Sequence, residues 1–143
     1  MSFMDAVKTC FGKYATFSGR ALRSEFWWYV LFIFIAQIVL GMVDRAVFGP
    51  SELMNMSATG MQGMQDGMGF AFAYQPQPIT GIFMLATLVP SLAVGARRLH
   101  DTGRSGWWQL IMLIPLIGVI VLIVFWASKG SDSENTYGPA PQA

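Results

Sequence analysis

The sequence predicts an all-α integral membrane protein with three transmembrane helices and an N-terminal amphipathic interfacial helix. Of its 143 residues, 54% are hydrophobic and 12% are charged, which is too apolar for a soluble domain of this size. The apolar residues gather in three long runs that contain no charged residue, at 26–43, 79–96 and 107–126. At ~1.5 Å per residue, runs of this length extend up to roughly 30 Å, the thickness of a hydrocarbon core.

The remaining segments of this single membrane domain are a helix at 2–16, an outer loop at 44–78 and a tail at 127–143. Ser2 is suited to cap the first helix, whose apolar residues project within about 120° of one another at 100° per residue. These residues are Phe3, Met4, Val7, Cys10, Phe11 and Tyr14. The pattern predicts an interfacial helix with its apolar side in lipid, and the alternative is that this side packs on the transmembrane helices.

The basic residues outside the runs predict the orientation. Seven of nine lie in the N-terminal segment or the second loop, namely Lys8, Lys13, Arg20, Arg23, Arg97, Arg98 and Arg104. Because basic residues are enriched on the cytoplasmic side, we expect a cytoplasmic N-terminus and a C-terminus outside. The remaining two basic residues, Arg45 and Lys129, would then lie outside as well. The formal net charge of +1 indicates no nucleic-acid partner.

The second loop, RRLHDTGRSGWW at 97–108, predicts a tight helical hairpin with a charged tip. Asp101 is suited to hydrogen-bond Arg97 and Arg98, and Ser105 is suited to cap the next helix. Further charges for structural pairing stand before the first run, at Arg20, Arg23 and Glu25. The expected interfacial anchors are Trp27, Trp28, Trp107 and Trp108.

Two interpretations of this tip stay open. One is a phosphate clamp for an anionic lipid headgroup, made by Arg97, Arg98, Arg104 and Ser105. The other is that the charges only fix the topology and pair with Asp101 or Glu25. A membrane enzyme that uses His100 and Asp101 is less favoured, because neighbouring residues of a helix do not face each other.

Small residues on the second run predict a surface for helix packing, at Thr87, Ser91 and Gly95. Pro115 and Gly118 predict a kink in the third run. Few polar residues lie inside the runs, which counts against a subunit of an oligomeric channel or transporter, although this remains the main alternative function.

Methionines in the first loop offer a weak alternative site for Cu(I), at Met54, Met56, Met61, Met64 and Met68. They also suit loose packing over the helix ends. With one cysteine and one histidine, the sequence predicts no zinc cluster and no cofactor.

Four blocks of the sequence resemble the YhaH-like bacterial inner-membrane family, a domain of unknown function numbered 805. They are FSGRALRSEFWWYVLF at 17–32, RRLHDTGRSGWW at 97–108, LIPLIG at 113–118 and SENTYGPAP at 133–141. The resemblance implies a multi-pass protein of the bacterial inner membrane and no particular reaction. Ser133 and Thr136 depart from the family's tail pattern, and the first loop looks longer than usual.

The leading hypothesis is therefore a non-enzymatic inner-membrane component that self-associates as a homo-oligomer and contacts membrane lipids. Its cytoplasmic arginine-rich hairpin would contact anionic phospholipid headgroups. We expect the tail to be ordered by Tyr137 and by the prolines at 139 and 141, and to fold back over the outer ends of the helices.

Overall fold

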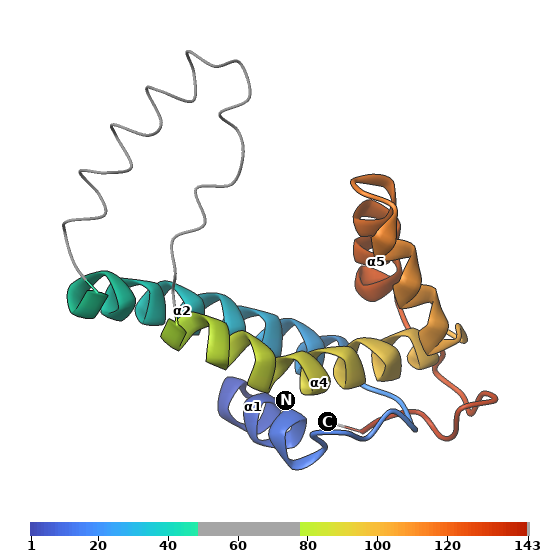
Figure 1. Ribbon diagram of the computed structural model, residues 1–143. Helices are drawn as coiled ribbons and strands as arrows, with labels where there is room; N and C mark the ends of the chain where they lie inside the picture. Colours follow the sequence, from blue (N-terminus) through green and yellow to red (C-terminus); the bar gives the residue numbers. More distant parts are fainter. Residues whose placement is uncertain (49–77, 143) are drawn as a thin grey trace. The chain divides into compact units, whose positions relative to one another are not determined.

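The computed structural model describes residues 1–48 and 78–142, in which the regular elements are helices. In chain order they are α1 (Phe3–Gly12), α2 (Arg23–Phe48), α4 (Pro78–Asp101), the 3-10 helix η1 (Gly106–Leu113) and α5 (Ile117–Ala127), as Figure 1 shows. The predicted all-α class is confirmed. The proposed copper ligands Met54, Met56, Met61, Met64 and Met68 lie outside the described residues, so that interpretation stays a prediction.

The chain divides into two compact units. One, here called the terminal unit, comprises Met1–Phe34 and Ala86–Ala143, and the other, the central unit, comprises Ile35–Leu85. The boundaries fall within α2 and α4, so each of these helices contributes one part to each unit.

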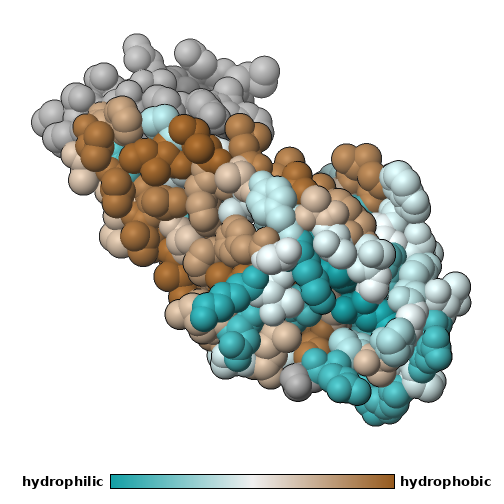
Figure 2. Space-filling model, turned by 90° about the horizontal axis from the view of Figure 1, so that it is seen from below, coloured by the Kyte–Doolittle hydropathy of each residue, from teal (hydrophilic) through white to brown (hydrophobic). Residues whose placement is uncertain are grey.

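Among the described residues, two helices are long and apolar enough to cross a membrane. α2 has 26 residues and α4 has 24, and they contain the predicted spans 26–43 and 79–96. At ~1.5 Å per residue each is longer than the ~30 Å of a hydrocarbon core. Exposed hydrophobic side chains are frequent along both helices, and the face drawn in Figure 2 separates a hydrophobic from a hydrophilic region. α4 begins at Pro78, and the fixed φ of proline suits the first turn of a helix.

The predicted third span at 107–126 is wrong as a single helix. The segment forms η1, an extended residue at Ile114, and then α5, which begins at Ile117. Leu116 has a φ of 64°, in the left-handed region that a bulky residue seldom adopts. Pro115 cannot donate a backbone hydrogen bond, so the helical ladder stops there and the chain reverses direction.

The two arms of this turn, η1 and α5, pack against each other as a helical hairpin. The rings of Trp108 and Phe125 lie 5.6 Å apart near its base, and Gly118 lies against the backbone of Ile111 near its tip. A Cβ atom on Gly118 would overlap the carbonyl oxygen of Ile111, so the close approach requires glycine. At ~2.0 Å per residue for a 3-10 helix and ~1.5 Å for an α-helix, each arm is roughly 16 Å long. Neither arm is long enough to cross a hydrocarbon core.

Part of the apolar side of α1 packs inside the terminal unit, as in the alternative interpretation, whereas Met4, Phe11 and Tyr14 are exposed, so its contact with lipid stays a prediction. Ala6 and Cys10 are fully buried. Phe11 makes edge contacts with Tyr29 and Phe32, at centroid distances of 6.0 and 5.8 Å. The helix itself begins after the N-cap Ser2, whose side chain accepts a hydrogen bond from the backbone of residue 5 as predicted.

The central unit contains a capping contact that the sequence analysis did not find. Asp44, near the end of α2, accepts hydrogen bonds from the backbone N–H groups of Ile79 (3.1 Å) and Thr80 (2.9 Å). Its carboxylate also accepts one from the hydroxyl of Thr80 (2.6 Å). A carboxylate from one helix therefore satisfies the N-terminal donors of the next.

Candidate functional site

Five charged side chains are buried together in the terminal unit, and we call them the arginine network. Arg20 precedes α2, Glu25 lies in its first turn, and the other three lie in the last turns of α4. The residues, with their exposed fractions, are Arg20 (6%), Glu25 (3%), Arg97 (1%), Arg98 (0%) and Asp101 (5%). Buried charges need partners, so the network determines much of the local structure.

Asp101 is shared by two arginines. Its Oδ1 atom lies 2.7 Å from Nη2 and 2.9 Å from Nε of Arg20, and its Oδ2 atom accepts from Nη1 of Arg98. The predicted partnership of Asp101 with Arg98 is therefore present, whereas the other partner is Arg20 in place of Arg97. An aspartate at the C-terminal end of a helix opposes the helix dipole, and the two guanidinium groups offset this.

Arg97 pairs instead with Glu25, at 2.5 Å between Nη1 and Oε1. The thiol of Cys10 lies 3.8 Å from the same carboxylate oxygen. Burial, and then the negative charge of Glu25, raise the pKa of the Cys10 thiol to about 12. Within the described residues, Nε and Nη2 of Arg97 have no hydrogen-bond partner. This corner of the network is thus a neutral thiol beside a closed ion pair, which disfavours thiolate chemistry.

Arg20 also binds the C-terminal tail. Its Nη1 atom donates to the carbonyl oxygens of Ser133 (2.8 Å) and Gly138 (3.2 Å), and its Nη2 atom donates to that of Ser131. A guanidinium group carries five N–H donors, so one side chain can satisfy several carbonyl groups of an irregular segment. Arg20 therefore joins the residues before α2 to the tail.

Arg98 makes the matching connection to the end of α5. Its Nε atom donates to the carbonyl oxygen of Trp126 (2.9 Å), and its Nη2 atom donates to that of Ser128. Its Nη1 atom also lies 3.3 Å from the carbonyl oxygen of Ala21. Three guanidinium groups face two carboxylates in the network, and the carbonyl oxygens that Arg20 and Arg98 bind share the surplus positive charge.

The tail is ordered, as expected, but it folds against the end of α4 that carries the arginines. The ring of Tyr137 stacks on His100 at 4.0 Å, and the side chain of Asn135 donates to the carbonyl oxygen of His100 (2.9 Å). Gly130 lies against the carboxylate of Asp101, where a Cβ atom would overlap it. The tail therefore lies at the same end of α4 as the second loop, and not over the opposite helix ends as expected, because η1 and α5 form a hairpin that returns the chain. The expected location of the C-terminus outside the membrane stays a prediction.

The four residues of the expected phosphate clamp do not converge on one exposed site. Arg97 and Arg98 are buried in the arginine network. The guanidinium carbon of Arg104 lies 4.0 Å above the ring of Phe125, a cation–π contact. Ser105 caps η1 and accepts a hydrogen bond from the backbone of residue 107 at 3.3 Å. Each side chain supports the protein itself, so the clamp is not formed as predicted.

The expected interfacial tryptophans all reach the surface, with exposed fractions of 38% for Trp27, 39% for Trp28, 78% for Trp107 and 46% for Trp108. Arg23 lies on the surface beside the first two and lines a shallow groove with them. Among the ion pairs of the described residues, none includes Arg23. Its charge therefore faces the surroundings of the protein.

The small residues of α4 pack against other parts of the same chain. The hydroxyl of Tyr29 lies 3.3 Å from the hydroxyl of Ser91 and 3.5 Å from the carbonyl oxygen of Thr87. At Gly95, an added Cβ atom would lie 2.7 Å from the side chain of Gln109, and the indole of Trp126 donates to its carbonyl oxygen at 3.3 Å. These contacts occupy the surface that suggested self-association.

His100 and Asp101 are held by different partners. One ring nitrogen of His100, Nδ1, lies 3.0 Å from the carbonyl oxygen of Gly19, whereas Asp101 faces Arg20 and Arg98. The pair therefore lacks the shared geometry that acid–base catalysis requires. Among the described residues, no three His, Cys, Asp or Glu side chains gather in a way that could hold a metal ion.

Comparisons with known proteins identify relatives along most of the chain. The family described as "Protein of unknown function (DUF805)" matches residues 14–139. The chain is 34% identical over 139 residues to inner membrane protein YhaH of Escherichia coli K12, covering 97% of this chain and 98% of that protein. It is 33% identical over 129 residues to inner membrane protein YhaI of the same strain, covering 90% and 88%. No solved structure matches.

Proposed function

The chain belongs to the DUF805 family, and we propose that it is a non-enzymatic inner-membrane component whose cytoplasmic surface contacts anionic lipid headgroups. In this proposal the arginine network is structural, and the exposed cations Lys8, Lys13 and Arg23 face the lipid. The main support for this proposal is that the five buried charges of the network are paired within the protein, which leaves the exposed cations for contact with lipid.

The membrane arrangement that we propose has two spans, α2 and α4, followed by a re-entrant hairpin formed by η1 and α5. Both arms of the hairpin are about half as long as a hydrocarbon core, so the segment would enter and leave the bilayer on the same side. Both termini then lie in the cytoplasm. This arrangement puts eight of the nine basic residues inside and leaves only Arg45 outside, which satisfies the positive-inside rule better than three spans do.

Arg23 and the neighbouring tryptophans support the contact with lipid. Its side chain lines a groove with Trp27 and Trp28 at the start of α2, where a span meets the headgroup layer. Tryptophan prefers this depth, and a guanidinium group binds phosphate through two parallel hydrogen bonds. Lys8 and Lys13, exposed on and after α1, add positive charge to the same unit.

The test of this proposal compares two brominated lipids in reconstituted bilayers. Brominated phosphatidylglycerol should quench the tryptophan fluorescence more than brominated phosphatidylcholine at the same mole fraction. Replacement of Lys8, Lys13 and Arg23 by glutamine should remove this preference. The matched control is Arg45→Gln, an exposed cation near the other end of α2, which should leave the preference unchanged. Equal quenching of the parent by both lipids would refute the proposal.

A further inference from the structure

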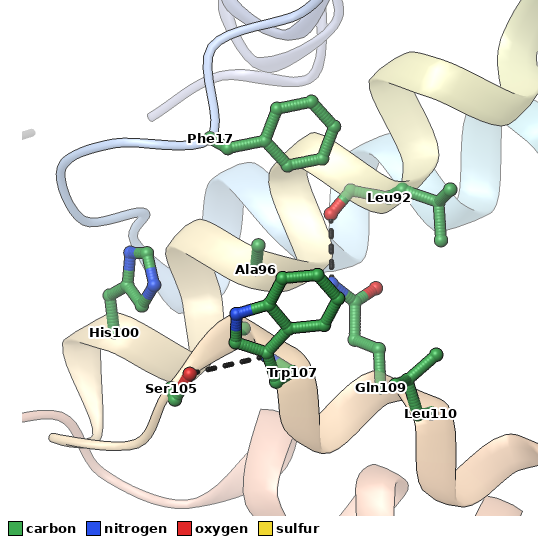
Figure 3. A pocket seen from close by; sticks show the side chains of 9 residues that line it. Phe17, Leu92, Ala96, His100, Ser105, Trp107, Gln109 and Leu110 are labelled. Atoms are coloured by element: carbon green, nitrogen blue, oxygen red, sulfur yellow. Dashed lines mark hydrogen bonds between the residues drawn. The ribbon is translucent and has the colours of Figure 1, made fainter.

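A cavity of about 480 Å³ lies in the terminal unit between the last turns of α4, the start of η1 and Phe17. Figure 3 shows the side chains that line it. Its walls are mostly apolar and are formed by Phe17, Leu92, Ala96, Trp107 and Leu110. This volume is within the range of pockets that hold small ligands, roughly 300–1,000 Å³, and apolar walls with a few polar groups are typical of them.

One end of the cavity is polar. His100 and Ser105 lie together there, away from Leu92 and Leu110, and Gln109 lies at the other end, where its side-chain amide donates to the carbonyl oxygen of Leu92 at 3.1 Å (Figure 3). Because a carbonyl oxygen only accepts, the Nδ1 atom of His100 donates to Gly19, and Nε2 is the ring nitrogen left for a ligand. An added Cβ atom on Gly106 would lie 3.6 Å from Nε2, so the glycine keeps the space in front of this atom open.

The walls of the cavity continue onto the surface that faces lipid in the proposed arrangement. Trp107 is 78% exposed, Leu110 is 58% exposed and Phe17 is 45% exposed. A ligand can therefore enter sideways from the bilayer, with an apolar chain along the walls and a small polar head at His100. This geometry fits one acyl chain better than a two-chain phospholipid, whose head carries a bulky phosphate ester.

The charges around the polar end favour an acidic head. Among the described residues, no Asp or Glu lines this cavity. A carboxyl group could share its proton with Nε2 of His100 and accept a hydrogen bond from the hydroxyl of Ser105.

We propose that this cavity binds a long-chain fatty acid, with its carboxyl group at His100 and Ser105 and its chain along Phe17, Leu92 and Leu110. The site uses residues other than Lys8, Lys13 and Arg23. The fatty-acid site can therefore be refuted while the proposed headgroup contact holds, and the headgroup contact can be refuted while the fatty-acid site holds. Trp107 in the cavity wall provides a fluorescent reporter.

The test titrates dibromostearic acid into the full-length protein in detergent and follows the quenching of tryptophan fluorescence. The methyl ester of the same acid is the control, since it has the same chain and bromine atoms without the acidic head. The acid should bind about tenfold more tightly than the ester, because the ester has no acidic proton to share with Nε2 of His100. Trp107→Phe should remove the component of the quenching that saturates.

Two variants locate the ligand. His100→Phe keeps an aromatic ring on Tyr137 but has no Nε2 atom, and it should bind the acid no better than the ester. Leu110→Phe adds bulk at an exposed wall position and should weaken the binding of both probes, even if His100→Phe fails to fold. Equal binding of acid and ester by the parent would overturn the carboxyl site. Quenching that does not depend on Trp107 or Leu110 would mean partition into the micelle and would overturn the cavity as a site.

Discussion

Replacement of Asp101 by asparagine removes the one carboxylate that lies between the guanidinium groups of Arg20 and Arg98. The asparagine side chain has nearly the same shape and keeps one acceptor oxygen, so the change acts mainly on charge. Two buried guanidinium groups would then face each other across a neutral amide. The variant therefore measures what the arginine network contributes to the fold.

The expected cost is about 3–5 kcal/mol, the range found when one partner of a buried ion pair is removed. This range applies because the side chains of Arg20 and Asp101 are 1% and 7% exposed, and that of Arg98 is fully buried. A typical protein has only ~5–15 kcal/mol of stability, so the loss is a large fraction of it. The tail should be affected first, because Arg20 binds the carbonyl oxygen of Ser133 and Arg98 binds that of Ser128.

The assay is thermal unfolding in detergent combined with limited proteolysis of the tail. Asp101→Asn should melt well below the parent and become sensitive to protease after Gly130. The matched control is Asp132→Asn, which removes the exposed ion pair between Lys129 and Asp132 (2.7 Å) and should change stability by about 1 kcal/mol or less. If Asp101→Asn has the same melting temperature as the control and its tail resists protease, the arginine network does not hold the fold together.

The remaining predictions concern Gly130 and Cys10. Gly130→Ala places a methyl group on the carboxylate of Asp101 and should lower the free energy of unfolding by about 1–3 kcal/mol. The control Gly12→Ala has open space around it and should be nearly neutral. Equal effects of the two variants in thermal unfolding would contradict the close approach of Gly130 to Asp101. Cys10 should resist maleimide at pH 8 until the protein unfolds, and labelling of the folded protein would show that the thiol is accessible. Because burial and Glu25 raise the pKa of Cys10 from 9.0 to about 12, its neutral form stabilises the fold in full below about pH 9, and this contribution is lost as the pH rises toward 12. The melting temperature of the parent should therefore fall more steeply over this range than that of Cys10→Ala, and parallel curves would contradict the shift.

The first two spans could be predicted because an unbroken apolar run of 18 residues has few outcomes other than a long helix. The run at 107–126 has the same composition but a different structure, because the reversal depends on the local backbone at Pro115 and Leu116. Hydropathy does not distinguish a continuous helix from two short arms. The LIPLIG motif indicated an interruption, since Pro115 breaks the helix and Gly118 permits close packing. The same residues would suit either a kinked helix or a reversal of the chain, so the motif could not decide between them.

The candidate site shows the same division between local and long-range information. The pair Arg98–Asp101 is three residues apart on one helix, so its spacing predicted it. Arg20 and Asp101 are 81 residues apart, and their contact follows only once the segment before α2 is packed against the end of α4. The tail was expected at the other ends of the helices because that expectation followed from a continuous third span, although the order of the tail itself was predicted from its turn residues.

The most direct test of the central claim is the side of the membrane on which the tail lies. Single cysteines at Phe48, Thr102 and Thr136, on a Cys10→Ser background, can be probed with an impermeant thiol reagent in intact spheroplasts. With two spans and a re-entrant hairpin, Phe48→Cys should react at once, and Thr102→Cys and Thr136→Cys should react only after the membrane is permeabilised. Labelling of Thr136→Cys in intact spheroplasts, with Thr102→Cys still protected, would show that residues 107–126 cross the membrane and would contradict the account.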